Sequence, residues 1–465
     1  MGNRTGALFA LSVLASAGTA HAEVKNVTTV AELTAAIGNA KAGDEIVLAA
    51  GTYRFGGVTC AANGTQQAPI IVRSATPLAA KIELDGLEGF KVTGASWQFD
   101  GLDIKGVCAT DSACEHAFHV TGAADDFVLR NSRVADFNAQ LKANATTNPY
   151  RAPNRGLIEG NDIGDTRARV TEAPVTKLNI DGGDDWVIRK NVLHDATKEG
   201  GNSVSYLAFF KSGGKRGVME QNLVLCERDY DPGSRTQIGL SLGGGLTGVQ
   251  FCNPEFVANG ICNIEHDEGV IRNNIIANCS DVGIYISRGR NSKVLYNTLI
   301  DTVGVDYRYP TASGEAYGNV LTGVIRTREG AMMPTEVGNL ENVNLGMFEA
   351  IYMDPLAGDL TAIGNTSLLG TGPAHPQLTN DYCGRTRPVS DLTRGALEHS
   401  LGECDTSMPG GPDAGPGGSD AGPGGGGGDD DVAGCCQSNL DSSWLIGFAV
   451  VVLALGRPRR RRARA

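Results

Sequence analysis

Lys211 is the residue of this chain with the clearest capacity for chemistry. It lies in the apolar phrase YLAFFKSGG, at 206–214. A lysine amine among apolar residues loses solvation in its charged form, so its pKa falls and it can accept a proton near neutral pH. Similar stretches of alternating apolar and polar residues recur along the chain, and aligning them with this one places Asp181 and Ser241 on the neighbouring repeats. The alternative is a solvated lysine that only forms an ion pair with Asp181.

The alignment of these phrases predicts two columns of outward-facing side chains on adjacent strands, which lie about 4.8 Å apart. The first column is His119, Asn179, Phe209, Gly239, Tyr285 and Asp306. The second column is Thr121, Asp181, Lys211, Ser241, Ser287 and Arg308. Neighbouring side chains of one column can then act together on one ligand.

Carboxylates and arginines near these columns are candidates for holding an anionic ligand. Asp181 and Glu199 are the candidate oxygen ligands for Ca²⁺. Arg288 and Arg308 are the candidate positive partners. Removal of a proton beside a carboxylate group requires a base to take the proton and a positive charge to neutralise the carboxylate. Lys211 would be the base, and an arginine or Ca²⁺ would neutralise the carboxylate. The competing interpretation is that the acidic residues of LNIDGGDD, at 178–185, only form a turn.

A recurring asparagine organises the middle of the chain. It occurs in the setting apolar-x-x-Asn-x-apolar at intervals of 22 to 52 residues. The members are Asn131, Asn161, Asn191, Asn222, Asn274, Asn297 and Asn319. A repeat of this length that carries short alternating strands and no helix is typical of stacked coils. The pattern predicts an all-β chain, folded as a parallel β-helix over 23–404, in which the asparagines form a structural ladder.

Two segments depart from the repeat. Residues 28–42, with Thr28 or Thr29 as the N-cap, have the apolar spacing of a short helix that would cap the first coil. The longest interval between asparagines holds an insertion, which includes 229–236 and 243–262. Long insertions in stacked repeats gather on one face and often line a binding site, so we expect this one to border the groove.

The chain resembles right-handed parallel β-helix proteins of the pectin-lyase-like superfamily. Its entry segment, 33–53, carries this resemblance together with the repeats. Lys211 and its phrase are distantly similar to the chondroitinase B and alginate lyase family, in which a lysine acts with an arginine of a successive coil beside a Ca²⁺ site. The repeat after Lys211, GLSLGG at 239–244, holds no arginine, so the arginine is either missing or supplied by Arg235, Arg288 or Arg308.

This resemblance implies β-elimination on an acidic polysaccharide. Lys211 would be the base, and an arginine or Ca²⁺ would neutralise the substrate carboxylate. The rival interpretation is a non-catalytic adhesin or matrix protein that uses the same groove only to bind carbohydrate. The fold alone does not decide between them, because one fold hosts many functions.

Both ends have the composition of targeting segments. Residues 1–22 combine one arginine, a short apolar run and an A-x-A site, as in a secretory signal peptide. Residues 405–433, rich in Gly, Pro and Asp, predict a flexible linker. Residues 434–465 resemble the MYXO-CTERM sorting signal, with Gly434-Cys435, a short apolar segment and terminal arginines. This resemblance implies export, membrane anchoring, processing by a sorting protease and cell-surface display. The alternative is an ordinary single-pass anchor.

Cysteine spacing predicts disulfides, because an exported chain folds in an oxidising compartment. The close pairs are Cys108–Cys114, Cys252–Cys262 and Cys383–Cys404, with Cys226–Cys279 as a further candidate and Cys60 left over.

The charge of the chain limits its partners. The formal net charge is −12. Without the basic residues of the two ends it becomes about −19, which argues against nucleic acid or an anionic membrane surface as the ligand of the folded part. We expect a polysaccharide partner and a monomeric protein.

Overall fold

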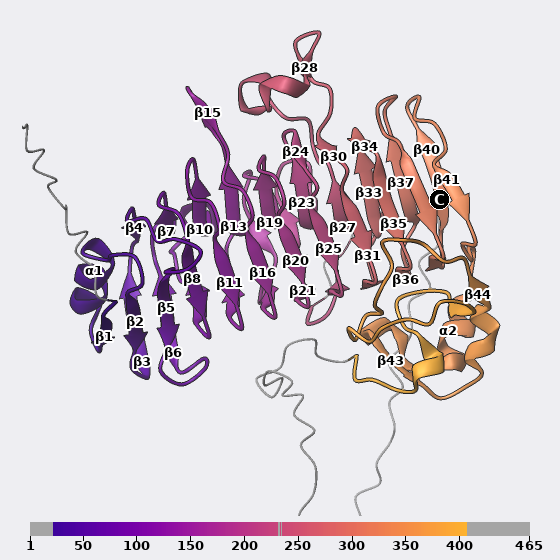
Figure 1. Cartoon of the computed structure of the whole chain (residues 1–465), viewed down its shortest axis with the longest axis horizontal. Coiled ribbons are helices and arrows are strands. Elements are labelled where there is room, and N and C mark those ends of the chain that lie inside the picture. Colours follow the sequence, from indigo (N-terminus) through magenta and orange to yellow (C-terminus); the bar gives the residue numbers. More distant parts are fainter. Residues whose placement is uncertain (1–21, 231–232, 234, 407–465) are drawn as a thin grey trace, which may run out of the picture. The chain divides into compact units, whose positions relative to one another are not determined.

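The computed structural model is a solenoid of stacked coils whose strands form three parallel sheets (Figure 1). It describes residues 22–230, 233 and 235–406. All of these residues belong to one compact unit, Met1–Gly415. The predicted signal peptide, apart from Ala22, lies outside the described residues, as do nearly all of the predicted linker and the whole sorting segment with Gly434 and Cys435. In the described ranges, no helix is long and apolar enough to cross a bilayer.

The chain visits the sheets in the order C, A, B in each coil, and every pairing between coils is parallel. Sheet A contains, in spatial order, β1 (Val24–Val27), β2 (Glu45–Leu48), β5 (Ile70–Ser74), β8 (Trp97–Asp100), β11 (Val128–Arg130), β16 (Leu157–Glu159), β20 (Val187–Arg189), β25 (Val218–Glu220), β31 (Val270–Arg272), β35 (Ser292–Leu295), β38 (Gly314–Tyr317) and β41 (Thr335–Val337). Sheet B contains β3 (Gly51–Phe55), β6 (Ala80–Leu84), β9 (Asp103–Gly106), β12 (Arg133–Ala135), β17 (Asp162–Gly164), β21 (Val192–His194), β26 (Leu223–Leu225), β32 (Ile275–Ala277), β36 (Thr298–Ile300) and β39 (Val320–Leu321). Sheet C contains β4 (Val58–Cys60), β7 (Glu88–Val92), β10 (His116–Thr121), β13 (Ala139–Asn144), β19 (Val175–Asp181), β23 (Val204–Lys211), β27 (Thr236–Leu242), β33 (Ile284–Ser287), β37 (Gly304–Arg308) and β40 (Val324–Arg328). This arrangement confirms the prediction of a right-handed parallel β-helix.

Shorter elements lie in the connections between the sheets and at the C-terminal end. The loop strands are β14 (Thr146–Thr147), β15 (Tyr150–Arg151), β18 (Arg169–Val170), β22 (Lys198–Glu199), β24 (Gly214–Lys215), β28 (Val257–Ala258), β29 (Ile261–Cys262), β30 (His266–Asp267) and β34 (Gly289–Arg290). The 3₁₀ turns are η1 (Asp111–Ala113), η2 (Val249–Phe251), η3 (Pro254–Phe256), η4 (Pro355–Ala357), η5 (Thr366–Leu369) and η6 (His399–Leu401). The C-terminal elements are α2 (Leu345–Ile351), β42 (Tyr352–Asp354), β43 (Asp359–Ala362), β44 (Thr371–Gly372) and β45 (Leu392–Thr393).

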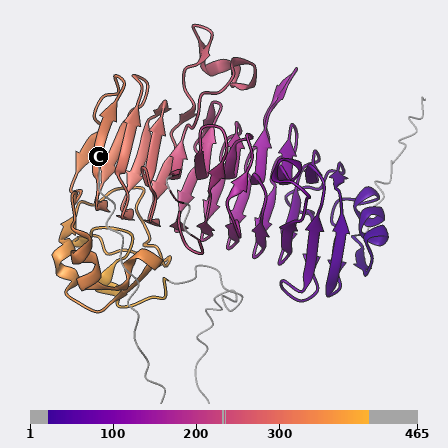
Figure 2. The same cartoon turned by 180° about the vertical axis from the view of Figure 1, so that it is seen from behind.

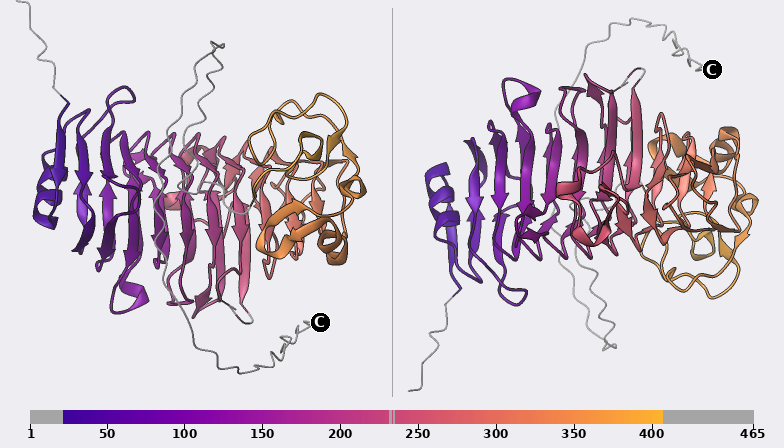
Figure 3. Two further views of the ribbon diagram at one scale, coloured as in Figure 1. Left: turned by 90° about the horizontal axis from the view of Figure 1, so that it is seen from below. Right: turned by 90° about the horizontal axis from the view of Figure 1, so that it is seen from above.

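A short helix closes the first coil, as the sequence predicts. This helix, α1 (Val30–Gly38), begins after Thr29, whose hydroxyl accepts from the backbone N–H of Glu32 while the Glu32 carboxylate accepts from the N–H of Thr29. This capping box satisfies amide groups that have no partner inside the helix. The buried face of α1 rests on the end of the stack (Figure 3).

The asparagine ladder runs along the turn between sheets A and B. At Asn222, the side-chain oxygen accepts from the backbone and the side-chain amide of Asn191, at 3.1 and 3.0 Å. The side-chain amide of Asn222 donates to Ile188 of the previous coil and to the Asn274 side chain, both at 3.0 Å. Each rung therefore pairs buried backbone groups that would otherwise cost free energy.

The ladder differs from the prediction at its two ends. Ser132, not Asn131, occupies the first rung: its N–H donates to Asn161, whereas Asn131 is exposed in a left-handed turn with φ 51°. At the other end, Asn339 adds a rung below Asn319. The spacing rule missed Asn339 because Glu336 stands where the rule requires an apolar residue.

Charged side chains alternate in sign along one outward column of sheet A. Parallel register places each member opposite the next. The column is Arg73, Asp100, Arg130, Glu159, Arg189, Glu220 and Arg272. Three of its neighbouring pairs are ion pairs of 2.7 to 2.8 Å. We call this set the alternating charge column.

The C-terminal segment covers the outer face of the last strands of sheet B. Leu223 and Ile275 of that face pack with Phe348 and Leu360 of the segment in a second hydrophobic core. Figures 1 and 2 show the segment, orange to yellow, beside the last coils. The segment therefore buries an apolar sheet face that water would otherwise contact.

The cysteine pairing confirms the prediction. Disulfides join Cys108–Cys114, Cys226–Cys279, Cys252–Cys262 and Cys383–Cys404. Cys60 is buried in the core as a free thiol, and burial raises its pKa, which disfavours the reactive thiolate.

Candidate functional site

The register of sheet C places a strand in the groove that the sequence alignment omitted. This strand, β13, lies between β10 and β19, so Lys142 stands between His119 and Asn179. The predicted adjacency of His119 and Asn179 is therefore wrong. The predicted position of Ser241 is also wrong by two residues, because it lies opposite Phe209 and not opposite Lys211.

Two lysines face one carboxylate at the centre of this groove. Lys211 lies opposite Asp181 in the register, and its Nζ is 3.3 Å from Asp181 Oδ1. Lys142 Nζ donates to Asp181 Oδ2 and, at 3.0 Å, to Asn179 Oδ1. The side chains of Lys142 and Lys211 are 19% and 17% exposed, so both amines remain within reach of a ligand. The structure thus supports the predicted pairing of Lys211 with Asp181 and adds a second amine.

The environment lowers the pKa of both amines. Burial, followed by the positive charge of Lys211, lowers the pKa of Lys142 from 10.5 to about 7, against the opposing charge of Glu115. Burial also lowers the pKa of Lys211, against the opposing charge of Glu265. Burial and the neighbouring amine therefore favour the neutral form of Lys142, which is the form that a general base needs.

Two histidines extend the polar floor toward the N-terminal coils. His119 Nδ1 lies 2.7 Å from Glu88 Oε1, and its Nε2 lies 2.6 Å from Asn144 Oδ1. His116 stacks edge-on against His119, and burial lowers the pKa of His116 to about 4. The Nδ1 atom of His116 is buried without a hydrogen-bond partner. A neutral imidazole with a free nitrogen can serve a bound ligand as donor or acceptor.

The floor and two loop excursions enclose a pocket of about 290 Å³. Its lining residues are His116, His119, Lys142, Asn144, Ala145, Asp181, Lys211, Ser212, Leu246, Thr247, Gly248 and Phe251. The last four belong to the predicted insertion, so the insertion does border the groove. Figure 1 shows β15 and β28, one from each excursion, projecting from the same edge of the stack.

A buried carboxylate ties the insertion to the lysine strand. Glu265 is fully buried and accepts from the N–H groups of Ser212 and Thr247, both at 3.0 Å, and from the Thr247 hydroxyl at 2.6 Å. Ser212 directly follows Lys211. The wall of the pocket and the lysine are therefore held in one fixed geometry.

The remaining predicted site residues lie elsewhere. Arg308 bonds to Glu329 and Tyr285, and β27 and β33 separate its strand from that of Lys211, a distance of about 14 Å. Arg288 stacks on Tyr309 and donates to a backbone carbonyl. Neither arginine lines the pocket of Lys211.

The described residues do not fit the predicted Ca²⁺ site. Of the two candidate ligands, Asp181 already receives two lysine amines, and Glu199 lies on β22 with Arg235 as its partner at 3.8 Å. Ca²⁺ takes six to eight oxygen ligands. The pocket lining contributes Asp181 as its carboxylate, so no step of the chemistry is assigned to Ca²⁺.

A second carboxylate cluster surrounds the buried side chain of His194. Burial disfavours its charged form, but the hydrogen bonds that its ring can donate to the carboxylates of Asp162 and Asp195 outweigh burial and raise the pKa of His194. His194, Asp195 and Asp229 lie close enough to hold a metal ion. Asp195 also accepts from the backbone amides of Arg228 and Asp229, so it anchors the following loop.

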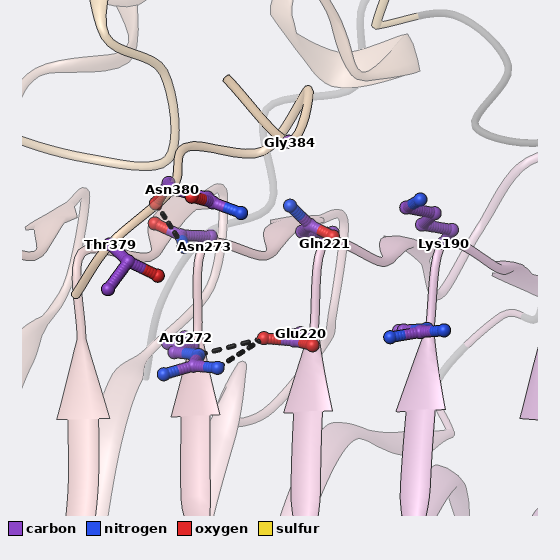
Figure 4. Close-up of a pocket in the computed structure, with 9 residues that line it drawn as sticks. Lys190, Glu220, Gln221, Arg272, Asn273, Thr379, Asn380 and Gly384 are labelled. Atoms are coloured by element: carbon purple, nitrogen blue, oxygen red, sulfur yellow. Dashed lines mark hydrogen bonds and ion pairs between the residues drawn. The ribbon is translucent and has the colours of Figure 1, made fainter. Parts of the chain in front are cut away.

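A second cavity, of about 190 Å³, lies where the C-terminal segment crosses the edge of sheet A (Figure 4). Arg272 points toward Glu220 and forms an ion pair of 2.7 Å with it. The side chain of Asn273 donates to the carbonyl of Asn380. Its central polar groups therefore hold each other.

Comparisons with known proteins agree with a polysaccharide-related groove without defining the family. A model of the family described as chondroitinase B matches residues 27–182. That match includes Lys142 and Asp181 and ends before Lys211. No curated protein is similar enough to the chain to be matched.

Several solved structures are similar at low identity. An alginate lyase from Paenibacillus sp. str. FPU-7 is 17% identical, with 68% of this chain and 99% of that chain covered and a TM-score of 0.40. The pectate lyase Pel9A is 14% identical, with 78% and 90% covered and a TM-score of 0.47. The PL6 family polysaccharide lyase Pedsa3628 from Pseudopedobacter saltans is 11% identical, with 80% and 98% covered and a TM-score of 0.35.

Proposed function

We propose that this protein cleaves an acidic, uronate-containing polysaccharide by β-elimination in the groove of sheet C. The observation that carries the proposal is the geometry of two amines, those of Lys142 and Lys211, which share one carboxylate in a pocket where burial lowers the pKa of both. The match to the chondroitinase B family model over residues that include Lys142 supports it. Lys211, which the sequence predicted to be the base, remains in the site but pairs with the substrate carboxylate instead.

The neutral amine of Lys142 takes the proton at C5 of the uronate. The electron pair of that C–H bond forms the C4–C5 double bond, and the bond from C4 to the glycosidic oxygen breaks. The leaving oxygen receives a proton, which the Lys142 ammonium can return. The charged amine of Lys211 pairs with the substrate carboxylate, so that negative charge developing beside C5 is stabilised.

We propose further that the protein is exported and displayed at the cell surface by its predicted signal peptide and C-terminal sorting segment. The four disulfides support an oxidising compartment.

The test follows the ultraviolet absorbance of the unsaturated uronate product. The purified protein is mixed with alginate, pectate and glycosaminoglycans, with and without Ca²⁺. We expect one polymer to give product, and Lys142→Met to lower the rate by about 10² to 10⁴-fold. Lys81→Met is the matched control, because Lys81 is exposed on β6 of sheet B and lies outside the pocket.

The second candidate function is a non-catalytic carbohydrate-binding surface protein. Asp181 favours it, since an amine that stays paired with a carboxylate is a poor base. Binding of one polymer without any product would establish this alternative and reject elimination.

A further inference from the structure

The pocket has two chemically different sides. Its floor is polar and carries Lys142, Lys211 and His119. Its wall, formed by the insertion, exposes Leu246 and Phe251 to the pocket, and these side chains are 64% and 48% exposed. Large apolar side chains this open to water cost free energy unless a ligand covers them.

The insertion is built to hold this wall rigid. Cys252, directly after Phe251, is joined to Cys262, and both pack with Phe256 and Ile264 in a small core of their own. The ammonium group of Lys215 lies over the ring of Phe256. Together with the Glu265 contacts to Thr247, these interactions fix the wall above the lysines. A preorganised wall loses little entropy when a ligand binds.

We propose that the exposed side chains of Leu246 and Phe251 form a ring-stacking subsite for one uronate pyranose. The inference rests on the proposed function and specifies how the substrate lies. The carboxylate of the sugar points to the amines of the floor. The apolar C–H face of the same ring lies against Phe251, as sugar rings lie on aromatic faces. The wall therefore selects a ring whose hydroxyls leave one face apolar.

A tryptophan placed in the wall reports this contact directly. The described tryptophans, Trp97 and Trp186, are buried in the core, so a tryptophan at position 251 would be an exposed reporter. Phe251→Trp is titrated with tetrasaccharides of mannuronate, guluronate and galacturonate, and with cellotetraose as a neutral probe. We expect a fluorescence change that saturates with an acidic tetrasaccharide.

The matched control lies on the same insertion. Ile261 is 42% exposed and adjoins the same disulfide, but it does not line the pocket. Ile261→Trp should give no change on titration, and Ile261→Ala should bind like the unaltered protein. Phe251→Ala should bind the same tetrasaccharide about tenfold more weakly, the scale expected for uncovering one apolar ring face. Its KM should rise with kcat little changed, and Leu246→Ala should act in the same direction.

The outcomes separate this inference from the proposed function. Turnover that is unaffected by Phe251→Ala, with a silent Phe251→Trp, would overturn the stacking subsite and leave elimination in place. A saturating signal without product would support the subsite and reject elimination. Absence of both binding and product for every acidic probe would reject the two together.

Discussion

Replacing Lys211 with methionine should raise the pKa of Lys142. The positive charge of Lys211 is one of the two causes that lower the pKa of Lys142, and both amines contact the same Asp181 carboxylate. Without Lys211, the repulsion disappears and Asp181 is left to Lys142 alone. Both changes favour the charged amine, so they act in the same direction.

The size of the shift follows from the geometry. Two amines that share one carboxylate lie about 6 Å apart, and at an effective dielectric constant of about 20 they repel by about 3 kcal/mol. Water reaches about a fifth of each side chain and screens part of this repulsion. We therefore expect an upward shift of about one pKa unit, or about 1.4 kcal/mol.

The assay is a carbon NMR titration of protein labelled at the lysine Cε, with the Lys142 signal assigned by its loss in Lys142→Met. The unaltered protein should show one lysine with a midpoint near 7, and Lys211→Met should move it toward 8. Lys81→Met is the control and should leave the midpoint in place. A Lys142 midpoint near 10.5 in the unaltered protein, or a downward shift in Lys211→Met, would refute the reasoning about this site.

Further predictions concern stability and specificity. Asn222→Ala should lower the free energy of unfolding by about 3–5 kcal/mol, because it leaves buried backbone groups unpaired. Asn131→Ala, at an exposed position, should lower it by less than about 0.5 kcal/mol. Urea unfolding measures both losses, and equal losses would contradict the structural role of the ladder. Burial lowers the pKa of His266 to about 3, so below pH 6.5 the unfolded chain binds a proton that the folded chain does not, and stability falls toward pH 3 by about 1.4 kcal/mol per pH unit. His266→Gln should make that loss shallower in thermal unfolding at several pH values. Arg308→Ala should change the rate of elimination by less than about twofold, and so should addition of EDTA. A large loss of rate in Arg308→Ala would restore the arginine hypothesis, and a large loss with EDTA would restore the Ca²⁺ hypothesis.

The sequence was sufficient for the architecture because the fold repeats. Asparagines from Asn161 to Asn319 mark the same turn in successive coils, and one position therefore predicts the others. The rule was misapplied at Asn131, because Arg133 stands where the rule requires an apolar residue. Leu129 and Val134 have the required spacing around Ser132, which forms the rung. At this end, a hydroxyl and a backbone amide replace the side-chain amide.

The site was harder to predict because it depends on register between distant segments. Lys142 was missed since its phrase, AQLKAN, lacks the glycine turn that ends most of the others. One signal could have revealed it: Asn161 requires a preceding groove strand, and 139–144 alternates as such a strand does. The lowered pKa of Lys142 could not have been predicted, because it depends on burial and on Lys211 from a strand two positions away in sheet C.

The alternating charge column restricts how this protein can change its length. Removing one coil from its middle, for example the coil of Glu159, would place Arg130 opposite Arg189, and like charges directly opposite on neighbouring strands destabilise a sheet. Removing two adjacent coils would restore opposite signs. Gain or loss of coils within this stretch should therefore be tolerated better in even numbers than in odd ones.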